Sequence, residues 1–255
     1  MPKNTSKRSG PGRIEGENSV ILHTRQGMAL FDGRPANPEK GKSAIYGVPR
    51  FYGAVKQIYF DAMADDPWAD WWLIKVDQAI EKAQQSLEEL RAEIQGFQPR
   101  NASISISNAH SVQPEPRPLN FAIPSYPHRM AYIVTDCDLM TLDVLNLFHA
   151  GLMTRQQKER LVHKIGKVAR GALTSATGFR HCGVTRNDVM ANNPKARKAK
   201  ELMGAVPEDV LNLKLRSDYA PELRQYSQDE TGSGQEERLE QDPQEPVVLK
   251  EVSQG

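Results

Sequence analysis

The stretch that decides the fold is RMAYIVTDCDLMTLDVLNLFHAGLMTRQQKERLVHKIGKVARGALTSA, residues 129–176. It begins with MAYIVT (130–135), an apolar run rich in β-branched residues that predicts a strand. Residues 137–150 then place leucines at near-helical steps, and Gly151 is the residue type that commonly follows a helix end. The first half of the stretch therefore predicts a strand followed by a helix.

A second helix is predicted after that turn. Thr154 and Gln157 have the spacing of a capping box, in which each side chain bonds the backbone N–H of the other residue. The helix ends by Gly178, and its apolar side chains recur at helical spacing: Leu161, Ile165, Val168, Ala169 and Ala172. Strand, helix, short turn and helix is the order of a ribbon-helix-helix module. In that module two chains pair their strands into an antiparallel ribbon that lies in the DNA major groove.

This interpretation predicts a homodimer, because a half-ribbon has no stable partner within its own chain. The expected dimerisation residues are Tyr132, Ile133 and Val134, at the centre of the predicted strand. An alternative stays open, in which the strand pairs with NASISIS (101–107). In that segment isoleucines and serines alternate as they do in a half-buried strand.

Charge is unevenly distributed along the chain, although the formal net charge is only +1. Residues 154–200 carry twelve Lys and Arg against two acids, whereas residues 61–98 carry nine acids against three bases. A basic block in a near-neutral chain favours a polyanionic partner. We predict contacts to double-stranded DNA from Arg129, Thr154, Arg155, Lys158, Lys164, Lys167, Arg170, Arg180 and Arg186. The competing interpretation is that the basic helix is only a solvated face.

Residues 19–215 are expected to form a single α+β core domain, mostly helical, with a small antiparallel sheet and the embedded element at 129–176. The basic arm at 1–18 and the acidic tail at 216–255 lack an apolar pattern, which predicts disorder. Within the core we expect a strand at 19–24 and helices near 51–64, 185–203 and 207–213.

The clearest helix start in the sequence is at Asp66 and Pro67, an N-cap residue followed by the residue type favoured at the first helical position. Apolar residues then form a heptad seam that ends before Gly96: Leu73, Val76, Ile80, Ala83, Leu87, Leu90 and Ile94. Such a seam suits a helix in the chain's own core, and it also suits a helix that dimerises.

Several groups of reactive residue types have simple structural explanations. A helix start accounts for Asp65, Asp66 and Asp70, which would otherwise suggest a metal site, and core packing accounts for Trp68, Trp71 and Trp72. Cys137 with His149 would suggest a nucleophile only if a base lies close in space, and Asp136 as a helix N-cap explains the same residues. His181 with Cys182 is an adjacent pair that lacks the second cysteine pair of a zinc site. Since the sequence also lacks both Gly-rich nucleotide-binding motifs, we expect no enzyme activity, no cofactor and no metal.

The expected compartment follows from what the chain contains. Its two cysteines form no disulfide framework and fit a reducing cytosol. No stretch approaches 18 consecutive apolar residues, and the polar N-terminus lacks the apolar core of a secretory signal. We therefore expect a cytoplasmic protein without a membrane partner.

Three segments resemble a known family: LHTRQGMALFDGR (22–34), GVPRFYGAVKQIYFDAMADDPWADWWLIKVDQAIE (47–81) and HRMAYIVTDCDLMTLDVLNLFHAGLMT (128–154). They are similar to a family of integrating conjugative element proteins that includes the AcaB-type transcriptional regulators of conjugative plasmids. The resemblance covers about residues 22–180. It implies a bacterial transcriptional regulator of conjugative transfer with a ribbon-helix-helix-like DNA-binding element, which we assign to 129–176 by its pattern.

The expected function is therefore sequence-specific binding of a dimer to a pseudo-palindromic operator. RNA polymerase would be recruited or excluded according to position, and no small-molecule ligand is expected. The alternative is a non-catalytic accessory interaction protein of the conjugation machinery. It would work through the heptad helix and the aromatic cluster at 68–72.

Overall fold

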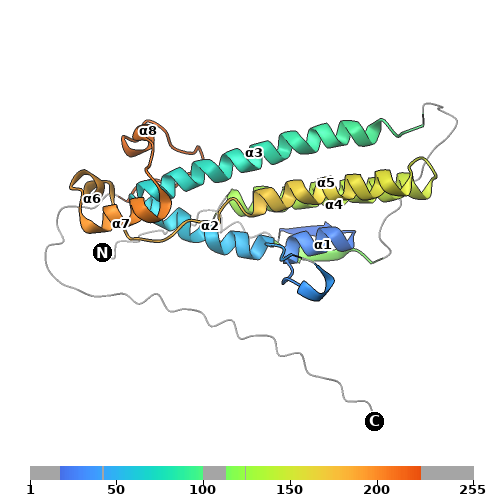
Figure 1. Cartoon of the computed structure of the whole chain (residues 1–255), viewed down its shortest axis with the longest axis horizontal. Coiled ribbons are helices and arrows are strands. Elements are labelled where there is room, and N and C mark those ends of the chain that lie inside the picture. The colour runs from blue at the N-terminus through green and yellow to red at the C-terminus, as the bar shows by residue number, and fades with distance from the viewer. Residues whose placement is uncertain (1–17, 42, 100–112, 124, 225–255) are drawn as a thin grey trace, which may run out of the picture. The chain divides into compact units, whose positions relative to one another are not determined.

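The structure is a computed structural model that describes residues 18–41, 43–99, 113–123 and 125–224 (Figure 1). Helices dominate these residues. In chain order the elements are β1 (Ser19–Leu22), α1 (Arg25–Asp32), the 3-10 turn η1 (Pro38–Lys40), α2 (Val48–Met63), α3 (Pro67–Gln95), β2 (Glu115–Pro118), α4 (Tyr126–His149), α5 (Arg155–Leu173), α6 (Arg186–Met190), α7 (Pro194–Met203) and α8 (Glu208–Leu211). The prediction of a mostly helical fold with a small antiparallel sheet is confirmed.

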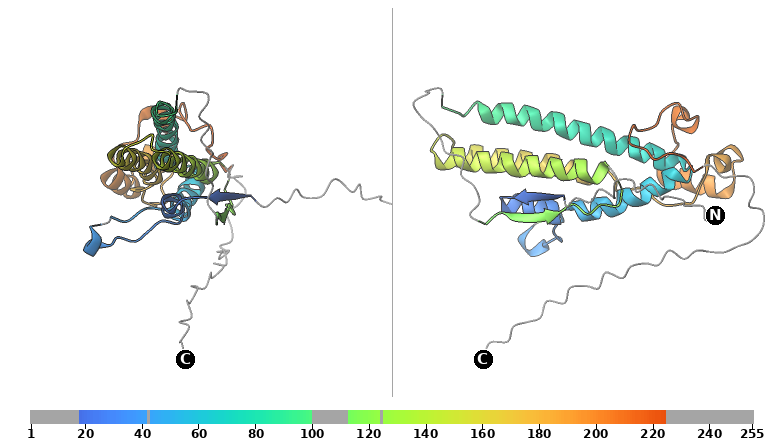
Figure 2. Two further views of the ribbon diagram at one scale, coloured as in Figure 1. Left: turned by 90° about the vertical axis from the view of Figure 1, so that its right-hand side faces the viewer. Right: turned by 180° about the vertical axis from the view of Figure 1, so that it is seen from behind.

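Helices α3, α4 and α5 pack side by side and form the centre of the fold (Figures 1 and 2). Helix α2 packs on α3 and α4, and α1 packs on α4. Every residue of the predicted heptad seam in α3 is buried against these neighbours: Leu73, Val76, Ile80, Ala83, Leu87, Leu90 and Ile94. The seam therefore belongs to the chain's own core, and it is not available to a second chain.

The prediction of a strand at 130–135 is wrong, because these residues lie in the first half of α4. The β-branched residues favoured a strand, but the buried side chains continue at helical spacing through the whole element: Met130, Ile133, Val134, Cys137, Met140, Val144 and Leu147. Burial of this apolar stripe against α3 and α5 stabilises the helix and outweighs local β propensity. The described residues therefore show no ribbon-helix-helix element.

The same correction applies to the dimerisation residues. Ile133 and Val134 are fully buried among the central helices, whereas Tyr132 is 57% exposed on the outer side of α4. Thr135, which also favoured a strand, is accommodated in the helix because its hydroxyl donates to the carbonyl oxygen of Ala131 one turn earlier. No strand edge exists here for a second chain to pair with.

The small sheet consists of β1 and β2, which pair antiparallel with Ser19 opposite Pro118 and Leu22 opposite Glu115. The strand predicted at 19–24 is confirmed, but its partner comes from a proline-rich stretch. Prolines are tolerated in β2 because an outer strand needs few ladder donors. The side chain of Arg117 then forms a bidentate pair with Asp32 at 2.9 Å, which ties β2 to the end of α1. The alternative strand at 101–107 lies outside the described residues.

The C-terminal part of the described chain packs where α3 begins (Figure 1). The helical region predicted at 185–203 is divided into α6 and α7 by a three-residue turn, and α8 occupies the next predicted helix. Beyond residue 215 the chain still packs on the core. Arg216 pairs with Asp70 at 2.8 Å, and the Ser217 hydroxyl lies 2.6 Å from that of Tyr126. Of the described helices, none is long and apolar enough to cross a membrane.

Candidate nucleic-acid interface

Helix α5 begins at the capping box predicted from the sequence. The Gln157 N–H donates to the Thr154 hydroxyl at 3.2 Å, and the Thr154 N–H donates to the Gln157 side-chain oxygen at 2.8 Å. One face of the helix is buried in the core: Leu161, Ile165, Ala169, Ala172 and Leu173. The opposite face is turned to solvent and holds three of the predicted DNA-contacting cations: Arg155, Lys164 and Lys167.

Some cations on this outer face are held in surface ion pairs. Arg155 pairs with Glu159 on the same helix at 2.8 Å, while Arg160 and Lys164 share Glu93 of α3 at 2.5 and 2.9 Å. Exposed pairs of this kind contribute about 0–1 kcal/mol to stability. A phosphate can therefore replace the carboxylate partner at small energetic cost.

Lys167 is exposed and has no acidic partner within the described part of the chain. Together with Lys82 of α3 it lines a groove of about 380 Å³ between α3 and α5. Small residues, among them Ala83 and Gly171, also line that groove. A groove with one lysine on each side suits a backbone phosphate.

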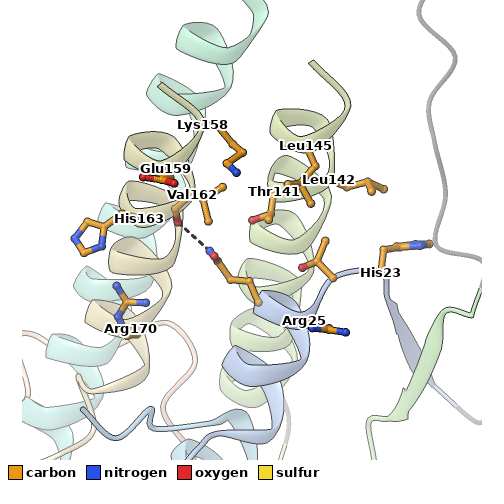
Figure 3. Close-up of a pocket in the computed structure, with 12 residues that line it drawn as sticks. His23, Arg25, Thr141, Leu142, Leu145, Lys158, Glu159, Val162, His163 and Arg170 are labelled. Atoms are coloured by element: carbon orange, nitrogen blue, oxygen red, sulfur yellow. Dashed lines mark hydrogen bonds between the residues drawn. The ribbon is translucent and has the colours of Figure 1, made fainter. Parts of the chain in front are cut away.

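Two further cations of α5 face α1 and α4 instead. Arg170 is half-buried, and no carboxylate pairs with it among residues 18–224 as described. Burial and the nearby charge of Arg34 lower the pKa of Arg170 from its ordinary value. The Lys158 ammonium lies 4.5 Å from the ring centroid of Phe148. These two residues line a groove between α1, α4 and α5 (Figure 3).

A second basic surface lies on α7. Asn193 caps this helix by accepting from the Ala196 N–H at 3.0 Å, and Pro194 starts it. Ala196, Ala199 and Met203 are buried, so the helix packs closely on the body. Its exposed half carries four cations, none of them in an ion pair with a described residue: Lys195, Arg197, Lys198 and Lys200.

The tryptophans of α3 hold this surface in place. The Trp68 ring N–H donates to the carbonyl oxygen of Gly204, directly after α7, at 2.9 Å. The Trp72 ring N–H donates to Thr177, after α5, at 3.4 Å. Both rings are buried, which confirms that they are core residues and not base-stacking platforms.

Arg186 was predicted to contact DNA, but it lies in the core with 5% of its side chain exposed. Its guanidinium pairs with Asp65 at 2.5 Å and with fully buried Asp70 at 2.6 Å. From the sequence alone, Arg186 cannot be distinguished from the other cations of residues 154–200, because the sequence does not show which cations neutralise buried acids. These ion pairs give Asp65 and Asp70 a structural role that needs no metal ion. No cluster with metal-binding geometry occurs in the described part of the chain.

Arg129 and Arg180 lie away from the outer face of α5. Arg129 pairs with Asp77 of α3, and its guanidinium lies 4.3 Å from the ring centroid of Tyr219. Arg180 is exposed, and its backbone N–H lies 3.2 Å from the Met203 sulfur at the end of α7. The structure thus places Arg180 beside the α7 surface and uses Arg129 to hold α3 to α4.

The nucleophile interpretation of Cys137 finds no support in its surroundings. Cys137 is completely buried, and burial raises the pKa of its thiol to about 12, with the charge of Asp136 adding to the shift. The thiol is therefore neutral at physiological pH and makes a weak contact with the Ile165 carbonyl oxygen at 3.8 Å.

Three cations that lie beside α5 were not predicted from the sequence: Arg25, Arg34 and Lys82. They lie in segments with no basic bias, and only long-range packing brings them beside α5. No local signal in the sequence identifies them.

The fold and these surfaces define a helical protein without an assembled catalytic centre among its described residues and with two cationic helix faces. The model of one family, described as transcriptional regulator AcaB, matches residues 10–224. The chain therefore belongs to the AcaB family of transcriptional regulators. Comparisons with curated proteins and with solved structures gave no significant match.

Proposed function

We propose that this protein is a sequence-specific DNA-binding regulator of conjugative transfer genes on a mobile element. The observation that carries the proposal is the pair of exposed cationic faces on α5 and α7 in a chain of a regulator family. Cations on α5 would neutralise backbone phosphates and release counterions, which supplies affinity without reading sequence. RNA polymerase would then be recruited or excluded according to the position of the bound site.

Since residues 130–135 are helical, base reading needs another element. Helix α7 is the best-suited described helix, because its exposed half carries Lys195, Arg197, Lys198 and Lys200 with Glu201 as the one acid of the helix. An α-helix fits the major groove, where Arg and Lys recognise guanine edges. The homodimer prediction was based on a ribbon formed by residues 130–135, and these residues are helical. Oligomeric state therefore belongs among the quantities to measure.

The accessory-protein alternative depended on two surfaces that the fold largely covers. The heptad seam of α3 and the rings of Trp68 and Trp72 are buried in the chain's own core, whereas the Trp71 ring is half-buried. The observations therefore favour DNA as the partner.

The test is binding of the purified chain to a labelled fragment from upstream of the element's transfer genes, with a scrambled fragment as control, across a salt series. We expect roughly hundredfold tighter binding to the native fragment. No binding to either fragment at low salt would overturn the proposal.

Two variants separate the roles of the helices. Lys167→Gln on α5 should weaken binding to both fragments and reduce the salt slope by about 1. Arg197→Gln on α7 should weaken binding mainly to the native fragment, by about 1–3 kcal/mol. Arg50→Gln, an exposed cation on α2, is the matched control and should change neither quantity.

A further inference from the structure

A groove lies between the first turn of α1, the middle of α4 and α5 (Figure 3). Its volume of about 670 Å³ is within the range of about 300–1,000 Å³ found for small-molecule sites. We call it the α1–α4–α5 groove. Leu142 and Leu145 of α4 and Val162 of α5 provide its apolar wall.

The polar side of the groove is cationic. Arg25, Lys158 and Arg170 line it from α1 and α5, and none of the three pairs with a carboxylate among the described residues. Glu159 is the one acid in the lining, and its charge is already compensated by Arg155 at 2.8 Å. The groove therefore combines an apolar wall with an uncompensated positive charge.

Arg170 is half-buried, and no carboxylate in the described part of the chain pairs with it. Gly166 leaves space for it: a Cβ atom there would lie 2.7 Å from the Arg170 Nη1 atom and 2.9 Å from the Gln26 Nε2 atom. Gln26 in turn donates to the Val162 carbonyl oxygen at 3.0 Å, which holds α1 against α5 (Figure 3). A partly desolvated guanidinium gains most from an anion that also covers the apolar surface beside it.

We propose that the α1–α4–α5 groove binds an amphipathic small-molecule anion, a carboxylate with an apolar tail or ring. The tail would cover Leu142, Leu145 and Val162, and the carboxylate would lie toward Arg170 and Lys158. A DNA backbone fits this groove less well. Its phosphates are matched by the exposed ridge of α5, but it has no apolar part to cover the leucines.

The proposal goes beyond DNA binding, although it shares α5 with that function. A bound anion neutralises Lys158 and Arg170, which lowers the positive potential of α5 beside its outer face. Occupancy of the groove should therefore weaken DNA binding, so that the regulator responds to a small molecule.

The test is calorimetric titration of the full chain with octanoate in the absence of DNA. We expect saturable binding of one octanoate per chain with a Kd at or below about 1 mM. Arg170→Gln and Leu145→Gln should each raise that Kd roughly tenfold. Lys167→Gln, which changes a cation of α5 outside the groove, should leave it unchanged, and thermal unfolding checks that every variant folds. Octan-1-ol, which has the tail without the charge, should bind at least about tenfold more weakly than octanoate.

Absence of saturable octanoate binding would overturn the proposal. So would variants in the groove that bind like the unchanged chain, or an alcohol that binds as tightly as the acid. Since this titration contains no DNA, its failure is separate from failure of the proposed function. In a second step, octanoate at a concentration near the Kd of the unchanged chain should weaken the DNA binding of that chain and have a much smaller effect on Leu145→Gln. Equal weakening of both would place the effect outside the groove and count against the proposed link.

Discussion

Single buried carboxylates organise the start of the fold. Asp138 of α4 is fully buried and accepts from the backbone N–H groups of His23 and Thr24 at 2.6 and 2.8 Å and from the Thr24 hydroxyl at 2.5 Å. Thr24 also caps α1 by accepting from the Gly27 N–H. The side chain of one residue in α4 therefore positions the first turn of α1, and with it Arg25 and Gln26 at the edge of the α1–α4–α5 groove.

Gly27 is required at this contact. A Cβ atom there would lie 2.1 Å from the Asp138 carboxylate oxygen, so Gly27→Ala should lower the free energy of unfolding by about 1–3 kcal/mol. The matched control is Gly53→Ala in α2, where nothing lies within 4 Å. That change should raise stability by about 0.5–1 kcal/mol. Urea unfolding followed by circular dichroism measures both, and equal effects at the two positions would contradict the packing argument.

Asp66 makes stability depend on pH. Burial raises the pKa of Asp66 to about 7, and the charge of Asp61 adds to the shift, while the N–H donors of Ala69 and Trp68 and the charge of His181 oppose it. The folded state therefore binds the Asp66 proton more tightly than the unfolded chain does. The resulting contribution of Asp66 to the free energy of unfolding is fully present below the ordinary carboxyl pKa near 4 and is lost as pH rises through about 7.

Asp66→Asn tests this, since asparagine keeps the N-cap but does not titrate. The free energy of unfolding of the unchanged chain should fall between about pH 4 and 7 relative to that of the variant. Parallel stability curves for the two proteins over this range would show that Asp66 does not carry the dependence.

At the scale of elements, the helix starts were the most predictable part. Asp66 with Pro67 and Thr154 with Gln157 begin α3 and α5 as predicted, because capping depends on a few adjacent residues. The type of element at 130–135 was not predictable from its residues. A short apolar run suits a strand or a buried helix, and its neighbours in space decide between them.

Helix α6 is joined to α3 by a buried ion pair that gives a further prediction. Arg186→Met should lower the free energy of unfolding by about 3 kcal/mol, at the lower end for a broken buried pair, because Arg216 still neutralises Asp70. Arg180→Met is the control. It removes an exposed cation of the same segment and should change stability by less than about 0.5 kcal/mol. Similar losses in urea unfolding would contradict the structural role of Arg186.

At the scale of the whole molecule, the cationic helices belong to a chain whose residues 227–255 carry eight acids against two bases. We infer that the net charge of −6 on this segment weakens the electrostatic attraction of the whole chain to DNA. Deleting residues 227–255 should tighten binding to random duplex DNA several-fold at about 50 mM salt, with a smaller gain at about 200 mM. Unchanged affinity at the lower salt concentration would count against this electrostatic effect.

The sequence by itself determined the family, the helical caps, the apolar stripe of α3 and the excess of positive charge at 154–200, since these depend on residue identity and short-range spacing. Only the tertiary structure decided that residues 130–135 are helical and that Arg186 and Arg129 neutralise acids of α3. It also brought Arg25, Lys158 and Arg170 together around one groove. The physical reason is that burial and charge pairing are properties of neighbours in space, and such neighbours can lie far apart along the chain, as Arg216 and Asp70 do at a separation of 146 positions.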